Sequence, residues 1–130
     1  MKRAMILFAH GARDPRWAQP FERLRDLVRA RSPGLEVTLA FLELMSPRLP
    51  EAAAALVAGG AQELTVVPVF LGQGGHVLRD LPALIDDLRT AHPRVAVRVA
   101  EAAGENAQVL DALASYCLDA AQNLQNLSGR

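Results

Sequence analysis

Apolar and polar positions along the chain follow two different periods, and these periods predict four strand–helix units. Short apolar runs rich in β-branched residues mark the strands, and apolar residues three or four positions apart mark the helices. The predicted strands are residues 3–8, 35–42, 63–71 and 94–99. The predicted helices are residues 18–31, 47–58, 78–91 and 105–126. Strands that alternate with helices are typical of a parallel sheet with helices on both faces.

The helices carry local signals as well. Ser46 and Pro47 predict the start of the second helix, because a hydroxyl caps the first turn and proline fits its first position. Gly59 and Gly60 predict its end, since glycine takes the left-handed cap without a steric penalty. Cys117 lies on the apolar stripe of the last helix, and we expect it to be buried in the core.

The composition of the strands predicts their order. The first and third strands are almost entirely apolar, as central strands are. The second and fourth alternate, for example Glu36 and Thr38 around Val37, and alternation indicates edges. The order 2-1-3-4 satisfies both observations. We therefore predict an α/β, flavodoxin-like, three-layer sandwich forming one domain over residues 1–130. Pro68 lacks the amide hydrogen that pairing needs, so it should lie at a bulge or near the end of pairing.

This strand order determines where a site can form. In an open parallel sheet, ligands bind beyond the carboxyl ends of the strands, where the strand order reverses. That point lies between the first and third strands, which are followed by loops 9–16 and 71–80. Each loop carries a histidine near glycine, His10 and His76, and Glu43 follows the second strand at the same edge. Two imidazoles and a carboxylate suit a divalent transition metal, so we predict one metal site there.

Each of these residues also has a purely structural explanation. A single loop histidine is as often a packing residue as a ligand, and an acid near a helix start complements the helix dipole. The matched placement of His10 and His76 favours function. We expect His92, at the end of the third helix, to be a dipole partner or an exposed residue. Asp14 before a proline predicts a turn or cap, and Trp17 predicts packing.

Composition limits the partners of the chain. Of its 130 residues, 51% are hydrophobic, and 14 basic residues balance 14 acidic ones. There is no net positive charge to attract nucleic acid and no basic amphipathic helix for a membrane surface. The single cysteine cannot form an internal disulfide, which suits a reducing compartment. The first apolar run is too short for a signal peptide or a spanning helix, so we expect a soluble, cytoplasmic protein.

The glycine-rich stretch at residues 72–75 raises the question of a nucleotide site. It resembles the start of a dinucleotide fingerprint, but Val77 occupies the third glycine position and there is no Walker lysine. Nucleotide binding is therefore discarded. Gly74 and Gly75 instead allow a tight turn and leave room for a broad, flat ligand.

Three motifs stand in order along nearly the whole chain. The first is HGARDP at residues 10–15, and the second is FLE at 41–43 with Pro47. The third is VPVFL at 67–71, followed by GGHV at 74–77 and DLP at 80–82. Each motif alone is weak, but the three together resemble the short-form class II chelatases, the CbiX-type sirohydrochlorin chelatase family.

The resemblance implies insertion of Co²⁺, or of Fe²⁺ or Ni²⁺, into sirohydrochlorin or a related tetrapyrrole. The metal is then a substrate, and no organic cofactor is expected. By the resemblance, His10 and His76 are metal ligands and Glu43 is an acidic residue of the same site. A histidine or Glu43 would take the pyrrole protons. The residues expected to bind the tetrapyrrole are Arg13, Arg16, Arg48, Arg79, Gly74 and Gly75.

The resemblance further implies a homodimer, because longer relatives carry two such domains in one chain. The chain departs from the family pattern at two places. Ala12 replaces the usual serine, and Gly72-Gln73 stands where Leu-Ala is common. Neither departure touches a proposed ligand, but both leave metal preference and substrate fit open.

Two other functions remain open at this point. A histidine phosphatase or phosphotransferase would use His10 as its nucleophile, but that class needs an arginine beside the histidine, and Ala9 occupies that place. A metal-carrying protein without enzyme activity would use His10 and His76 to deliver cobalt or nickel.

Overall fold

The computed structural model describes the backbone of residues 1–72 and 74–128, and the side chains of all of these except 75–78 and 124–128. The strands are β1 (Arg3–Ala9), β2 (Glu36–Phe41), β3 (Glu63–Pro68) and β4 (Ala96–Val99). The helices are α1 (Gln19–Arg31), α2 (Leu49–Ala58), α3 (Gly75–Ala91) and α4 (Ala107–Ser128). Two short 3-10 helices are η1 (Pro15–Ala18) and η2 (Ala103–Glu105). Every predicted strand and helix is present, with each end within three residues of its predicted position.

The four strands form one parallel sheet in the order β2-β1-β3-β4, as predicted. β1 is central and pairs on both sides, with Arg3 opposite Glu63 at one end of its β3 ladder and Phe8 opposite Pro68 at the other. Pro68 is thus the last residue of β3, where a missing amide hydrogen costs no internal ladder bond. This confirms the prediction that it lies near the end of pairing.

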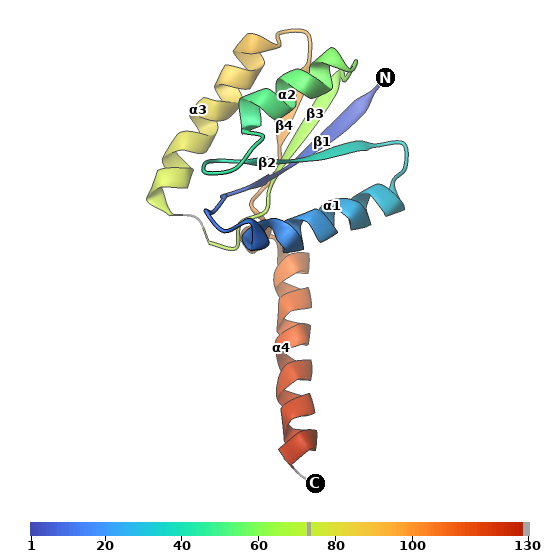
Figure 1. Cartoon of the computed structure of the whole chain (residues 1–130), viewed down its shortest axis with the longest axis vertical. Helices are drawn as coiled ribbons and strands as arrows, with labels where there is room; N and C mark the ends of the chain where they lie inside the picture. The colour runs from blue at the N-terminus through green and yellow to red at the C-terminus, as the bar shows by residue number, and fades with distance from the viewer. Residues whose placement is uncertain (73, 129–130) are drawn as a thin grey trace.

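Helices cover both faces of the sheet, and each face has its own apolar cluster (Figure 1). α1 packs on one face, and α2 and α3 pack on the other. The buried residues on the α1 face are Leu7, Ala9, Ala18, Val37, Leu39 and Phe41. Those on the opposite face include Ile6, Phe8, Leu49, Leu56, Leu64, Val66, Ile85 and Leu88. The three-layer prediction is therefore confirmed.

The start of α2 differs from the prediction. Ser46 and Pro47 precede the helix and are joined by a cis peptide bond. The amide of Phe41 donates to the carbonyl of Pro47 at 2.9 Å, which holds this segment extended beside the end of β2. The helix therefore begins two residues later, at Leu49, where the Arg48 amide donates to Glu51 Oε1 at 3.4 Å. The serine–proline pair ends the loop instead of starting the helix.

The end of α2 agrees with the prediction in place and differs in detail. The helix stops at Ala58, before both glycines. Gly59 has φ −80° and Gly60 has φ +101°, so the second glycine is the one that needs the left-handed region.

The last helix also differs from the prediction, because α4 projects away from the sheet and Cys117 is exposed (Figure 1). The chain turns away from the sheet at η2, where Gly104 lies so close to the backbone of Leu71 that a Cβ atom there would collide with it. α4 therefore leaves the domain with its apolar stripe uncovered. None of the described helices, α4 included, is both long and apolar enough to cross a membrane.

The fold makes a direct prediction about stability. The side chain of Leu64, in β3, is fully buried, so Leu64→Ala should lower the free energy of unfolding by roughly 2–5 kcal/mol. Leu27 on α1 is 53% exposed, and Leu27→Ala is the matched control, with an expected change of about 0.5 kcal/mol or less. Urea unfolding followed by circular dichroism measures both. Equal losses in the two variants would contradict the assigned core.

Candidate metal centre

His10 directly follows β1, at the carboxyl edge of the sheet where the strand order reverses. Its Nε2 atom lies 3.3 Å from Oε1 of Glu43, and each side chain is 44% exposed. Phe70, which follows β3, places its ring edge-on to the imidazole, with 6.3 Å between the ring centres. The end of β3 therefore meets the end of β1 at His10, as the predicted crevice requires.

Backbone hydrogen bonds fix the separation of His10 and Glu43. The pairing of β1 with β2 continues past both strand ends. The amide of Leu42 donates to the carbonyl of Ala9 at 2.9 Å, and the amide of Glu43 donates to the carbonyl of His10 at 3.1 Å. The two side chains therefore come together because their own backbones are bonded. The prediction that Glu43 lies beside His10 is confirmed.

Gly11 makes this close approach possible. Its φ is +100°, in the region that L side chains rarely adopt, and a Cβ atom there would collide with the carbonyl oxygen of Glu43. Leu44, which follows Glu43, has φ +67°. A residue with a side chain is strained in this left-handed region. The two backbone segments are thus held tightly against each other.

A cavity of about 640 Å³ opens beside Glu43, between the start of α2 and the face of α3. Its walls are apolar at the sheet, where Phe8 and Phe41 line it. Its charged lining residues are Arg48, Glu43, Glu51, Asp80 and Asp87. Four carboxylates against one guanidinium make the cavity suited to a cation and unsuited to an anion.

Sequence reasoning missed this cavity and the role of Phe70. Asp80 and Asp87 are seven residues apart, which places both on one face of a helix, and that spacing is the signal that indicates an acidic wall. Phe70 is the second-to-last residue of the third apolar run, 63–71, and a residue at the carboxyl end of a strand is expected to reach the crevice.

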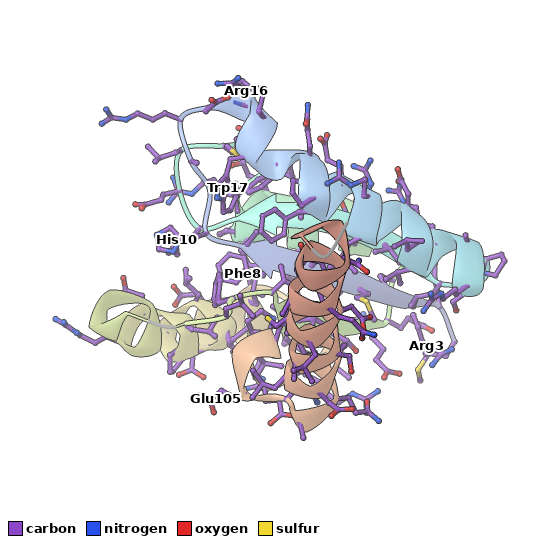
Figure 2. The ribbon with its side chains drawn as sticks, turned by 90° about the horizontal axis from the view of Figure 1, so that it is seen from below. Arg3, Phe8, His10, Arg16, Trp17 and Glu105 are labelled. Atoms are coloured by element: carbon purple, nitrogen blue, oxygen red, sulfur yellow. The ribbon has the colours of Figure 1, made fainter. Side chains whose placement is uncertain are left out.

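The loop between His10 and α1 is held by a pair of charges. Asp14 caps η1, as a turn or cap residue should, by accepting from the Arg16 amide at 2.9 Å. The Arg16 guanidinium donates to Asp14 Oδ2 at 2.6 Å, and this bond, with the amide bond second, lowers the pKa of the Asp14 carboxyl. The same contact raises the pKa of Arg16. Figure 2 shows Arg16 at the outer part of this loop, away from His10.

The other predicted substrate-binding residues lie at the surface. Arg13 and Arg79 are exposed, and Arg48 is exposed at the mouth of the acidic cavity. Gly74 is exposed and caps the start of α3. Trp17 packs against Phe21, with 4.6 Å between ring centres, so the prediction of a packing role is confirmed.

His76 is in the first turn of α3, whereas the sequence analysis predicted a loop there. Gly74 has extended dihedral angles, which let the chain turn directly into the helix, so α3 begins three residues earlier than expected. The side chain of His76 lies outside the described residues, and only the backbone of Gly75 is described. Among the described side chains, no three of the His, Cys, Asp and Glu residues gather closely enough to hold a metal ion. His10 and Glu43 stay two of the predicted ligands, and His76 stays the predicted third.

His92 lies at the other end of α3, far from this edge of the sheet in the fold. It is the C-cap of the helix, and its amide donates to the carbonyl of Leu88 at 2.9 Å. Its imidazole is half-buried. This position supports the structural role predicted for it.

Several known proteins are similar to this chain in sequence or in structure. Over 89 residues the chain is 33% identical to the sirohydrochlorin cobaltochelatase of Methanocaldococcus jannaschii, covering 68% of this chain and 62% of that protein. The CbiX protein of Marinobacter aquaeolei VT8 superposes with a TM-score of 0.80 at 31% identity, covering 93% of this chain and 98% of that one. The sirohydrochlorin chelatase SirB from Bacillus subtilis subspecies spizizenii, solved in complex with cobalt, gives a TM-score of 0.77 at 25% identity.

The matches differ in how much of each relative they cover. SirB is matched over 92% of this chain but 51% of its own length, so the chain corresponds to about half of that protein. The matched part likewise spans about three-fifths of the methanogen relatives. The family model for CbiX, in contrast, matches residues 4–120, from β1 into α4, including His10 and Glu43. The chain therefore belongs to the CbiX family.

Proposed function

We propose that this protein is a sirohydrochlorin chelatase, which inserts Co²⁺, or alternatively Fe²⁺ or Ni²⁺, into sirohydrochlorin or a related tetrapyrrole of cobalamin- or sirohaem-type biosynthesis. The observation that carries the proposal is the His10–Glu43 pair, 3.3 Å apart at the switch point of the sheet. Membership of a family with members named cobaltochelatases, and a structural neighbour solved with cobalt, support the same activity.

The chemistry of insertion fits this pair. A pyrrole macrocycle must lose two protons, and the incoming ion must lose water. An imidazole nitrogen and a carboxylate oxygen both bind such ions, and His76 would supply a second imidazole. Because both described side chains are 44% exposed, positions on the ion stay open for the macrocycle. A histidine or Glu43, whose carboxylate lies within hydrogen-bond range of the His10 imidazole, would accept a pyrrole proton.

Acidic and basic side chains around the His10–Glu43 pair favour different substrates. The acidic cavity beside Glu43 favours a cation and repels the carboxylates of a tetrapyrrole. Arg13, Arg48 and Arg79 are exposed, and guanidinium groups bind carboxylates well. We therefore place the metal on the cavity side of His10 and the macrocycle on its outer side, over Gly74 and Gly75. Arg16 would join only by leaving Asp14.

The rival functions make different demands on His10. A phosphatase histidine needs a cation for the phosphate, whereas the carboxylate of Glu43 lies 3.3 Å from His10 and would repel an anion. A metal carrier would use the same ligands, and kinetics must separate it from a chelatase. Oxygen-free single-turnover spectra with Co²⁺, Ni²⁺ and Fe²⁺ in turn show macrocycle metallation for a chelatase alone.

The histidines provide the first test. His10→Ala and His76→Ala should each lower cobalt insertion by roughly 100-fold or more, because each removes a ligand of the transferred ion. Unfolding free energies should change by about 0.5 kcal/mol, as is usual for surface positions. The double variant should be little worse than either single one. His92→Ala is the control and should behave like the wild type. Wild-type insertion rates in both single variants would show that the site lies elsewhere.

Gly11 provides a test of geometry without removing a ligand. Gly11→Ala adds a methyl group that collides with the Glu43 carbonyl oxygen and strains a φ of +100°, so Glu43 should move away from His10. We expect slower cobalt insertion and a destabilisation of roughly 1–2 kcal/mol. Gly34→Ala, in a turn with open space around it, is the matched control and should change neither. Rapid insertion by a folded Gly11→Ala protein would argue against a role for the His10–Glu43 spacing.

The proposal includes a cytoplasmic homodimer. One domain offers an open edge, and a flat macrocycle needs a wall on each side, which a second copy would supply. Sedimentation velocity at micromolar concentration should therefore show dimers. A protein that sediments only as a monomer and inserts cobalt at full rate would leave the chelatase proposal standing and remove the dimer from it.

A further inference from the structure

The imidazole of His10 is contacted from two sides. On the β2 side, its Nε2 atom lies 3.3 Å from Oε1 of Glu43. On the β3 side, the ring of Phe70 meets it with 6.3 Å between the ring centres and 70° between the ring planes. Phe70 is 6% exposed, whereas the His10 side chain is 44% exposed. A half-exposed candidate ligand therefore rests on a buried aromatic ring.

The register of the sheet explains why these two rings meet. β1 and β3 pair in parallel, and Phe8 lies opposite Pro68 at the end of the ladder. The pairing continues one step further, because the amide of Val69 donates to the carbonyl of Phe8 at 2.9 Å. Two positions beyond Phe8 and Pro68, the same register places His10 opposite Phe70. Because every second side chain of an extended segment points to the same face, His10 and Phe70 lie on the face of the sheet where Phe8 is buried.

Phe70 is itself fixed through both its ring and its backbone. Its ring packs edge-on against Phe8, with 5.7 Å between the ring centres, and both rings belong to the same apolar cluster. Its carbonyl accepts a hydrogen bond from the amide of Gly104 in η2 at 2.8 Å. The backbone of the next residue, Leu71, lies so close to Gly104 that a Cβ atom there would collide with it. The ring that meets His10 is therefore held by the core on one side and by η2 on the other.

The contact with Glu43 alone does not fix the plane of the imidazole. It involves one ring nitrogen, and the outer torsion of a histidine side chain has a broad range of allowed angles. A ring that turns freely loses this freedom when it binds an ion, and that loss weakens binding. A fixed aromatic ring on the other side of the imidazole removes the freedom beforehand.

We propose that Phe70 is a positioning residue for His10, whose buried ring fixes the rotamer of the imidazole so that it meets an incoming divalent ion beside the Glu43 carboxylate. The inference rests on the proposed function, which makes His10 a ligand of the transferred ion. Phe70 has no ligand atom and acts only through His10. Removing a residue that orients a metal-binding histidine typically weakens metal binding by roughly 10- to 100-fold. A residue that only fills the core would have no such effect.

The first experiment measures Co²⁺ binding by calorimetry. Phe70→Leu keeps an apolar side chain and removes the ring, so the dissociation constant for Co²⁺ should rise by roughly tenfold or more. Phe70→Met, whose flexible side chain fills more of the space, is a second ring-free variant in case Phe70→Leu folds poorly. Leu88→Ala is the control, because Leu88 belongs to the same apolar cluster, is 2% exposed and lies near the far end of α3.

The control separates positioning from folding. Folded Leu88→Ala should bind Co²⁺ with the affinity of the wild type, although it removes more side-chain volume from the cluster than Phe70→Leu does. Wild-type affinity in the ring-free variants would overturn the proposal. An equal loss of affinity in Leu88→Ala would overturn it as well, because any damage to the core would then have the same effect.

The second experiment observes the imidazole itself, without metal or macrocycle. Three-bond couplings measured by nuclear magnetic resonance report the rotamer of His10, which should be single in the wild type and in Leu88→Ala and averaged in Phe70→Leu. A single His10 rotamer in Phe70→Leu would overturn the proposal. Cobalt insertion by the wild type is assayed separately. A wild-type chain that orders His10 through Phe70 but never inserts cobalt would remove the chelatase proposal and support the positioning role, so the two failures are distinguishable.

Discussion

The site depends on the pairing of β1 with β2 beyond the ends of both strands. The carbonyls of Ala9 and His10 accept from the amides of Leu42 and Glu43, so the loop after one strand is hydrogen-bonded to the loop after the other. Glycine is required at position 11 because the backbone of Glu43 lies too close for any Cβ atom there. In the proposed site, a ligand pair held by backbone hydrogen bonds would be in place before a metal arrives, which would reduce the entropy cost of binding it.

The same constraint explains why sequence could predict part of this site. His10 and Glu43 follow strands whose order was readable from edge-like alternation in β2, and parallel strands bring their carboxyl ends to one edge. Their proximity followed from topology alone. The acidic cavity was missed because its shape depends on how far α2 and α3 stand apart above the sheet, and the spacing between helices leaves no local pattern in a sequence.

The failed predictions share a physical cause, which is that a local sequence signal does not show what a segment contacts in the fold. Ser46-Pro47 has the composition of a helix start, but the Phe41 amide captures the Pro47 carbonyl and keeps the segment extended. Cys117 lies on a stripe with helical spacing, and such a stripe shows that a helix has an apolar side. It does not show which molecule covers that side. The sequence therefore predicts the apolar stripe of α4 correctly but does not predict where the helix lies.

Half-open geometry is what distinguishes insertion from storage of a metal ion. A site that encloses an ion with four protein ligands has no open coordination position. In the proposed site, the half-exposed pair His10 and Glu43 would leave coordination positions for the macrocycle nitrogens. An open site needs something other than its own ligands to hold the macrocycle in register. In the proposed homodimer, a second copy would supply that support. The proposed homodimer would therefore meet a need that the open geometry of the proposed site itself creates.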